Sequence, residues 1–203
     1  FDKSGFNMTG RASAPAYPTH PQFFTKATTS LSGPGQPIRY DEALTQSVDY
    51  EGEVAVVIGS TCKNVQPSEA WRHVFGCVLL NDVTARDLQK NHAQWFLGKS
   101  LDTFCPMGPW IATSDEIDVS SCTLTTWVNG ELRQQANLAD LIFDIPTLIA
   151  ALSSAMTLLP GDVIATGTPA GVGIGFTPPR FLKPGDRVRI EVPGIGVLEN
   201  PVA

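Results

Sequence analysis

Asp49-Tyr-Glu-Gly-Glu-Val-Ala-Val-Val-Ile-Gly59 is a stretch in which two glutamates lead into a run of apolar, mostly β-branched residues that ends at a glycine. Such a run predicts a buried β-strand. Residues 74–80 form a second apolar run of strand length. Residues 124–128 and 131–134 flank Asn129-Gly130, the pair most typical of a hairpin turn of type I′. The chain is therefore predicted to be rich in β-structure.

Two short segments carry helix signals. Residues 67–73 begin with a proline, and Ser68 is the predicted N-cap. Residues 144–152 begin with an aspartate that is expected to cap a helix with one apolar face. Two Pro-Gly-Asp triplets, at 160–162 and 184–186, predict turns in which the glycine takes a positive φ. These helices are too few for an alternating βαβ pattern, which excludes a dinucleotide-binding fold of the Rossmann type.

We predict a β-rich α+β fold, a mixed β-sandwich or roll with a few short helices. Its 203 residues suit a single domain overall. Residues 1–40 are rich in Pro, Gly, Ser and Thr and form a predicted N-terminal loop-rich segment. Residues 41–203 carry the strand and helix signals and form the predicted catalytic domain.

Composition excludes several kinds of partner. The chain has 14 basic and 20 acidic residues, a net charge of −6, which argues against nucleic-acid binding. The most apolar stretch, residues 138–159, is interrupted by charged residues and a proline, so no membrane segment is predicted. The four cysteines are widely spaced, without a Cys-x-x-Cys pair. We interpret them as reduced thiols and expect a cytoplasmic location.

Three acidic residues suggest a metal site. Glu51 and Glu53 are two apart, and on a strand this spacing puts both carboxylates on one face. On spacing alone, the favoured alternative is a solvated strand edge with two surface acids. Asp82, however, ends the second apolar run, where an uncompensated carboxylate is costly. Three carboxylates without a His or Cys partner point to Mg²⁺ or Mn²⁺, with Ca²⁺ less favoured.

Six motifs, in order, resemble those of the fumarylacetoacetate hydrolase family and together cover roughly residues 21 to 202. They lie at 49–59, at Asn81-Asp-Val-Thr-Ala-Arg-Asp-Leu-Gln89, at Gln94-Trp-Phe-Leu-Gly-Lys-Ser100 with the following 102–110, at 128–131, at 160–164 and at Thr166-Gly-Thr-Pro169. The resemblance implies the β-rich fold of that family's C-terminal domain and a homodimer.

The resemblance also implies roles for individual residues. The implied metal ligands are Glu51, Glu53 and Asp82; the implied catalytic residues are Lys99, Gln89 and Arg86; the implied substrate-binding residues are Thr168, Gly167, Gln94 and Trp95. A cationic Lys99 would stabilise the negative charge of a forming enolate. Alternatives stay open: Lys99 as a surface ion pair, Arg86 as a support for neighbouring carboxylates, and Thr168 as an ordinary turn residue.

The implied substrate is a small oxo acid. Our first interpretation is a divalent-metal-dependent hydrolase that cleaves a C–C bond of a diketo acid, such as an acylpyruvate or a fumarylacetoacetate-like compound, through a metal-bound enolate. The alternative within the family is an oxaloacetate decarboxylase or an oxo-acid tautomerase or isomerase. An alternative of another class is a catalytically silent binding module, against which the intact acidic residues and Lys99 argue.

Hydrolysis needs a base that activates water, and hydrolytic family members lead us to expect a His near the N-terminus. Here Gly5-Phe6-Asn7 runs directly into Met8, without that segment. Either a mobile lid is missing from this sequence after Asn7, which we favour, or the segment is deleted. The three histidines present are poor substitutes for this base. His20 and His73 are predicted to be structural, and His92 is only a weak candidate for a catalytic role.

Overall fold

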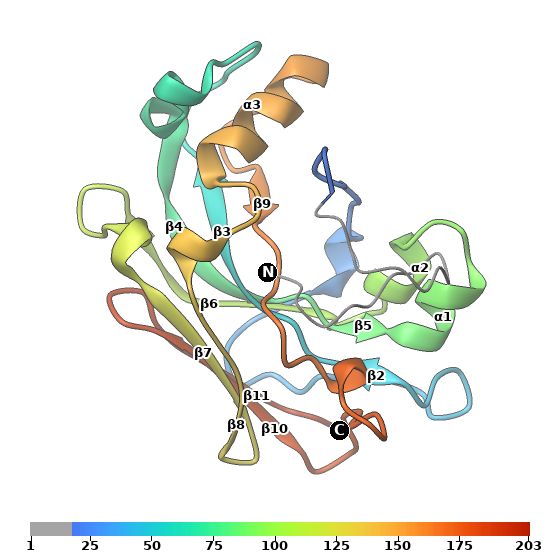
Figure 1. Ribbon diagram of the computed structural model, residues 1–203. Coiled ribbons are helices and arrows are strands. Elements are labelled where there is room, and N and C mark those ends of the chain that lie inside the picture. Colours follow the sequence, from blue (N-terminus) through green and yellow to red (C-terminus); the bar gives the residue numbers. More distant parts are fainter. Residues whose placement is uncertain (1–17) are drawn as a thin grey trace.

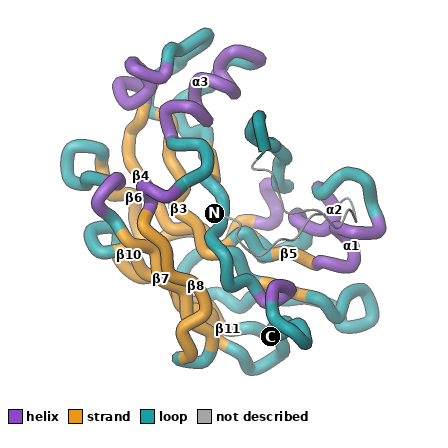
Figure 2. The backbone as a smooth tube through the Cα atoms, viewed as in Figure 1, coloured by secondary structure: helices purple, strands orange, loops and turns teal. Residues whose placement is uncertain are grey.

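Two β-sheets that pack against each other make up the body of the structure, a computed structural model that describes residues 18–203 (Figure 1). The first sheet has the strand order β1-β6-β4-β3-β9, and the second has the order β11-β10-β7-β8. A short two-stranded sheet joins β2 and β5. Helices are few and short, and Figure 2 shows them at the margins of the strands. The predicted β-rich α+β fold is confirmed.

The bounds of the elements are as follows. The strands are β1 (Leu31–Ser32), β2 (Val48–Asp49), β3 (Gly52–Ile58), β4 (Val74–Asn81), β5 (Thr84–Ala85), β6 (Cys105–Thr113), β7 (Thr123–Val128), β8 (Glu131–Asn137), β9 (Val163–Ala165), β10 (Arg187–Val192) and β11 (Gly196–Pro201). The α-helices are α1 (Arg86–Asn91), α2 (Phe96–Lys99) and α3 (Ile145–Ala155). The 3-10 helices are η1 (Thr28–Ser30), η2 (Pro67–His73), η3 (Val119–Ser121), η4 (Leu138–Asp140) and η5 (Gly173–Gly175).

Strand β3 lies inside the first sheet, between β4 and β9, and all seven of its residues are buried. Val54 and Val56 face the core shared with the second sheet, whereas Ala55 and Val57 belong to a smaller cluster on the opposite face. Burial on both faces explains why the segment reads as a continuous apolar run rather than an alternating one. Pairing is antiparallel throughout, except between β1 and β6.

The predicted hairpin is confirmed between β7 and β8. Asn129 has φ 53° and Gly130 has φ 79°, and a type I′ turn requires both central residues to have positive φ. The two Pro-Gly-Asp turns also have the expected backbone, with φ 92° at Gly161 and φ 93° at Gly185. Local turn chemistry therefore determined these connections.

The helix predictions were right in position and partly wrong in detail. The carboxylate of Asp144 accepts a hydrogen bond from the backbone nitrogen of Thr147 at 2.8 Å and caps α3 as expected. Residues 67–73 form η2, but the N-cap is Gln66, and Ser68 caps nothing. Pro67 occupies the first helical position, where its fixed φ starts the turn without a side-chain cap.

Two further observations concern the described chain. All four cysteines are buried and unpaired, as expected for reduced thiols. Within residues 18–203, every helix is too short or too polar to cross a lipid bilayer. The expectation of a lid or its loss after Asn7 falls on residues outside the described part.

Candidate metal centre and active site

The ladder between β3 and β4 brings the three predicted acidic residues together. Gly52 pairs with Asn81, so Glu51 and Asp82 lie at the same end of the two strands. The backbone nitrogen of Asp82 donates to the carbonyl of Glu51 at 2.9 Å. One carboxylate oxygen from each of Glu51, Glu53 and Asp82 lies within 4.8 Å of the others, and all three residues are buried. The alternative of two surface acids is therefore wrong.

Gly52 lets the two sheets come close at the point where the acidic residues lie. A Cβ atom at this position would lie 2.2 Å from the hydroxyl oxygen of Thr126 on β7 and 3.2 Å from the amide oxygen of Gln134 on β8. Only a residue without a side chain fits between the neighbouring glutamates and the second sheet. The close approach fixes the strand that carries Glu51 and Glu53.

The carboxylate of Glu53 lies in an environment that disfavours its negative charge. Burial raises the pKa of its carboxyl well above the ordinary value, and the charges of Asp82 and Glu51 raise it further. The backbone nitrogen of Gly167 donates to one Glu53 oxygen at 2.7 Å and compensates only in part. A cation among the three carboxylates would remove this repulsion.

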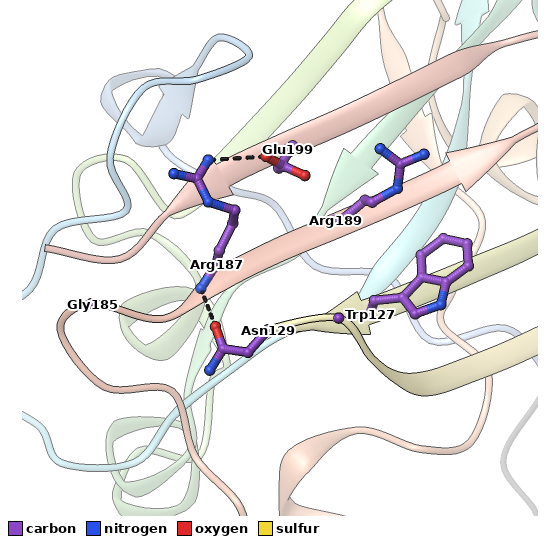
Figure 3. Close-up of a pocket in the computed structure, with 7 residues that line it drawn as sticks. Trp127, Asn129, Gly185, Arg187, Arg189 and Glu199 are labelled. Atoms are coloured by element: carbon purple, nitrogen blue, oxygen red, sulfur yellow. Dashed lines mark hydrogen bonds and ion pairs between the residues drawn. The ribbon is translucent and has the colours of Figure 1, made fainter.

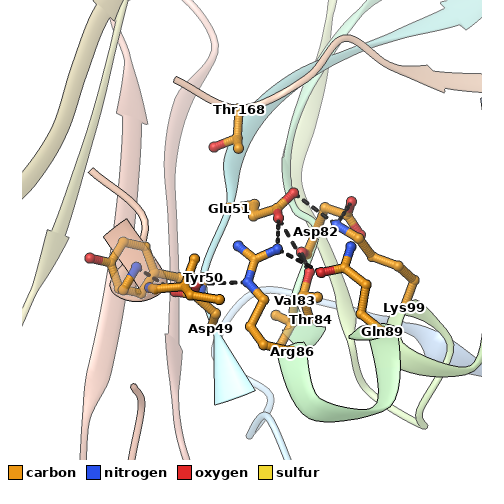
Figure 4. A network of polar contacts seen from close by, with 12 residues as sticks. Asp49, Tyr50, Glu51, Asp82, Val83, Thr84, Arg86, Gln89, Lys99 and Thr168 are labelled. Atoms are coloured by element: carbon orange, nitrogen blue, oxygen red, sulfur yellow. Dashed lines mark hydrogen bonds and ion pairs between the residues drawn. The ribbon is translucent and has the colours of Figure 1, made fainter. Parts of the chain in front are cut away.

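Lys99 lies directly between two of the acids, with its side chain 2% exposed. Its Nζ donates to Glu51 at 2.8 Å and to Asp82 at 2.5 Å (Figure 4). Burial alone would lower the pKa of Lys99, but Asp82 and Glu51 raise it above its ordinary value, so the ammonium form is retained. The alternative of a surface ion pair is wrong.

Glycine before Lys99 explains how α2 reaches this position. A Cβ atom on Gly98 would lie 2.6 Å from the backbone nitrogen of Gln89 on α1 and 2.8 Å from the carbonyl of Ala85. The bare glycine therefore lets the two short helices pack closely. That packing puts the lysine at the end of α2 under the acidic residues.

Arg86, at the start of α1, supports the carboxylates. Its Nε donates to Asp49 at 2.9 Å and its Nη1 lies 2.6 Å from an oxygen of Glu51. Nη1 also donates to the amide oxygen of Gln89 at 3.2 Å. The interpretation of Arg86 as a residue that holds neighbouring carboxylates accounts for these contacts, and Gln89 lies beside it.

Sequence reasoning missed Lys26. Its Nζ donates to Asp82 at 2.6 Å, on the carboxylate oxygen that Lys99 does not contact. Burial raises the pKa of Asp82, but Lys99 and then Lys26 outweigh it and hold that pKa below its ordinary value. Lys26 comes from the loop-rich N-terminal segment, 56 positions from its partner, and nothing in its neighbourhood marked it.

The predicted substrate-binding residues divide into two groups. Gly167 and Thr168 lie on the loop after β9, where the backbone nitrogen of Gly167 donates to Glu53. Figure 4 shows Thr168 above Glu51. Trp95 lies near the lysine, where its ring packs edge-on against Phe24 at 5.4 Å between centroids, and Phe24 itself lies 5.0 Å from the Lys99 Nζ. Gln94 is exposed and has no hydrogen bond to the acidic residues within the described chain.

None of the three histidines, all of which lie in the described part, contacts the acidic residues. His20 is exposed and lies 3.0 Å from the Thr19 hydroxyl. His73 lies 2.8 Å from the Ser60 hydroxyl, and His92 is exposed. The sequence-based candidate His92 is therefore not brought into the site.

The donor set fits a hard divalent cation. Three buried carboxylates offer one oxygen each at a spacing that a single ion can span, and no sulfur or imidazole ligand competes within residues 18–203. Such a cation, when bound by Glu51, Glu53 and Asp82, supplies Lewis-acid stabilisation of negative charge on a substrate oxygen. The repulsion around Glu53 is the structural feature that it would relieve.

A hollow of about 500 Å³ lies elsewhere, on the second sheet (Figure 3). It is lined by Trp127, Asn129, Gly130, Gly185, Arg187, Arg189 and Glu199. Arg187 pairs with Glu199 at 2.9 Å, and the ring of Trp127 lies 5.6 Å from the Arg189 guanidinium. Arg189 pairs instead with Glu191, and none of these charged groups belongs to the acidic site.

Fold and site together define a β-rich protein with a buried cluster of three carboxylates that could hold a metal ion. The sequence model described as "Fumarylacetoacetate (FAA) hydrolase C-terminal" matches residues 3–203. The chain belongs to the fumarylacetoacetate hydrolase family.

Several relatives are similar over most of this chain. "Oxaloacetate tautomerase YisK" of Bacillus subtilis (strain 168) is 50% identical over 186 residues, which is 91% of this chain and 62% of that protein. "Oxaloacetate tautomerase fahd2, mitochondrial" of Xenopus laevis is 47% identical over 188 residues, 91% of this chain and 59% of that protein. The chain thus spans about three fifths of the length of these curated relatives.

A solved structure confirms the fold. The "Fumarylacetoacetate hydrolase (EaFAH) from psychrophilic Exiguobacterium antarcticum" superposes with a TM-score of 0.87 and 52% sequence identity. The match covers 88% of this chain and 65% of that one.

Proposed function

We propose that this chain is the catalytic part of an oxo-acid tautomerase that uses Mg²⁺ or Mn²⁺ and interconverts the keto and enol forms of an oxaloacetate-like 2-oxo dicarboxylate. The observation that carries the proposal is the buried ammonium group of Lys99, which lies between Glu51 and Asp82 beside the candidate cation site. The names of two relatives, 50% and 47% identical, support the choice of reaction and of substrate class.

The charges of the site suit an anionic substrate. The charged side chains in contact there are Asp49, Glu51, Glu53, Asp82, Lys26, Arg86 and Lys99. When all are ionised, the four carboxylates exceed the three cations by one negative charge. A divalent cation would reverse this to one positive charge, which attracts a carboxylate substrate in a buried site of low dielectric.

Keto–enol exchange requires only proton transfer and stabilisation of negative charge. The keto form loses a proton from the carbon next to the oxo group, the oxo oxygen gains one, and the double bond moves from C=O to C=C, with no carbon–carbon bond broken. Negative charge builds up on that oxygen during the exchange. Lys99 carries a proton at Nζ inside the buried site, so it can stabilise this charge and give that proton to the oxo oxygen. The neutral amine left behind can then take the proton that leaves the carbon, so both proton transfers balance on this one group.

Hydrolytic C–C cleavage, our first interpretation from the sequence, requires one more functional group. It needs an additional base that activates water. The histidines of the described chain do not reach the site, and the position after Asn7, where a segment with such a base was expected, lies outside the described residues. Tautomerisation uses only groups that are in place, and it is therefore the reaction we propose.

The test follows the enol absorbance of oxaloacetate after dilution of the enol form into buffer with Mn²⁺. We expect the protein to speed the approach to equilibrium without consuming oxaloacetate, and Lys99→Met to lose at least about 100-fold in kcat. Release of pyruvate, or cleavage of acetylpyruvate in a parallel assay, would replace the proposal with decarboxylation or hydrolysis. A protein inactive in all three assays would be a silent binding module.

A further inference from the structure

The side chain of Gln134, on β8, connects three parts of the site and is 1% exposed. Its amide oxygen accepts from the backbone nitrogen of Gly52 at 3.0 Å. Its amide nitrogen donates to the hydroxyl oxygen of Thr168 at 2.8 Å and to the carbonyl of Pro169 at 2.9 Å. One carboxamide thus ties the loop after β9 to the residue between Glu51 and Glu53.

Chemistry fixes the direction of each of these hydrogen bonds. The Gly52 nitrogen can only donate and the Pro169 carbonyl can only accept, so the Gln134 amide has one possible orientation. The Thr168 hydroxyl also contacts the Gly52 carbonyl at 3.0 Å, which can only accept. Its single proton is therefore given to Gly52, and it must accept from Gln134.

This assignment decides what Thr168 can offer to a substrate. A carboxylate oxygen accepts hydrogen bonds, and the Thr168 hydroxyl has no proton left to give. Figure 4 shows that hydroxyl directed away from Asp82 and Lys99. The backbone nitrogen of Gly167 is already bonded to Glu53, whereas that of Thr168 has no acceptor within residues 18–203.

We propose that Gln134 is a positioning residue that clamps the Thr168 loop onto the strand of the metal ligands, so that the backbone N–H of Thr168, not its hydroxyl, meets the substrate carboxylate. The substrate part of this inference rests on the proposed function. The clamp itself rests on the four hydrogen bonds among Gln134, Thr168, Gly52 and Pro169.

The first variant to test is Gln134→Met, which keeps the length of the side chain and removes its hydrogen bonds. We expect the KM for oxaloacetate to rise about 10- to 100-fold, because a displaced loop misplaces its donor, with a smaller change in kcat. Amide hydrogen exchange of residues 167–172 should become faster. Gln135→Met, on the adjacent exposed residue of β8, is the matched control and should change neither quantity.

Thr168→Val and Thr168→Ser keep the inference testable if Gln134→Met does not fold. Valine removes the hydroxyl and should raise both KM and loop exchange, whereas serine keeps one donor and one acceptor and should restore them. The double variant Gln134→Met/Thr168→Val should lose no more than the worse single variant, because both changes break one clamp.

Two results would overturn the inference: losses of the two single variants that multiply in the double variant, or unchanged loop exchange in both single variants. Multiplying losses would mean that the hydroxyl contacts the substrate independently of Gln134. A wild-type protein without turnover would contradict the proposed function instead. Amide hydrogen exchange of the loop would still decide whether the clamp exists.

Discussion

Asp49 anchors more of the site than its place in the sequence suggests. Its carboxylate accepts from the backbone nitrogens of Tyr50, Gly173 and Ile174 and from the Nε of Arg86, and the residue is fully buried. It therefore joins the 3-10 helix η5 to the arginine that holds Glu51. These contacts support the carboxylates of the candidate metal site from behind.

Asp49→Asn should destabilise the folded protein by about 3–5 kcal/mol, because the change leaves the buried Arg86 with one fewer charge partner. Urea denaturation followed by circular dichroism measures the loss. Asp115→Asn, at an exposed position, is the control and should stay within about 0.5 kcal/mol of the wild type. Equal stability of the two variants would show that the Asp49 network is unimportant for the fold.

The burial of Cys77 leads to a prediction about the reactivity of its thiol. Burial, with a smaller contribution from Cys122, raises the pKa of Cys77 from its ordinary value of 9.0 to about 12. Because the thiolate is the reactive form, Cys77 should resist alkylation at pH 8 in the folded protein and react in urea. Mass spectrometry after iodoacetamide treatment checks this, and rapid modification of the native protein would contradict it.

The same shift has a consequence for stability. The unfolded chain loses its thiol proton at a lower pH than the folded one. The free energy that the buried Cys77 thiol contributes to folding is therefore fully present below pH 9.0, and it decreases as the pH rises towards about 12.

Among the elements, β3 shows best what sequence could and could not predict. The buried strand and the side-by-side placement of Glu51 and Glu53 followed from strand spacing and from the apolar run. The contacts of Glu51 and Gly52 with Arg86 and Gln134 join residues 35 and 82 positions apart, and no local pattern encodes them. Periodicity reveals which face of a strand is buried, but not which distant polar group lies against it.

The hairpin β7–β8 and the 3-10 helix η2 also differ in how well the sequence predicts them. The Asn129-Gly130 turn is encoded by two residues that tolerate positive φ, so it was predictable. Ser68 looked like a cap because serine often is one, yet Pro67 starts η2 one position earlier. Lys26 could not be anticipated, because its partner Asp82 is reached only through the tertiary fold.

Gly52→Ala tests the close approach of the two sheets. The new methyl group would collide with the Thr126 hydroxyl at 2.2 Å, and relief requires a shift of β3 or β7. We expect a stability loss of about 1–3 kcal/mol, together with weaker binding of Mn²⁺ because Glu51 and Glu53 move with the strand. Denaturation and calorimetric titration measure the two effects.

Gly33→Ala is the control for that change, since a Cβ atom there meets nothing within 4 Å. If Gly52→Ala matched it in stability and in Mn²⁺ affinity, the packing between β3 and the hairpin would not position the ligands.

At the scale of the whole molecule, the homodimer expected from the family resemblance stays a prediction. The first sheet exposes large apolar side chains, among them Phe75 on β4 at 51%, and Trp110 and Ile111 on β6 at 59% and 41%. Exposed apolar groups of this size favour association. Light scattering should give twice the chain mass, and Trp110→Glu should shift it towards the monomer.

A monomeric wild type at micromolar concentration would contradict the dimer, and Leu44→Glu is the matched control. Leu44 is also an exposed apolar residue, at 54%, but it lies in the connection between β1 and β2, not on β4 or β6. Its substitution should leave the mass unchanged.

An anomalous difference map from crystals grown with Mn²⁺ would locate a bound ion directly. We predict one strong peak per chain, bounded by carboxylate oxygens of Glu51, Glu53 and Asp82, and its loss in crystals of Glu53→Gln. A map without a peak among these three residues, at a Mn²⁺ concentration that saturates any activity, would contradict the metal centre.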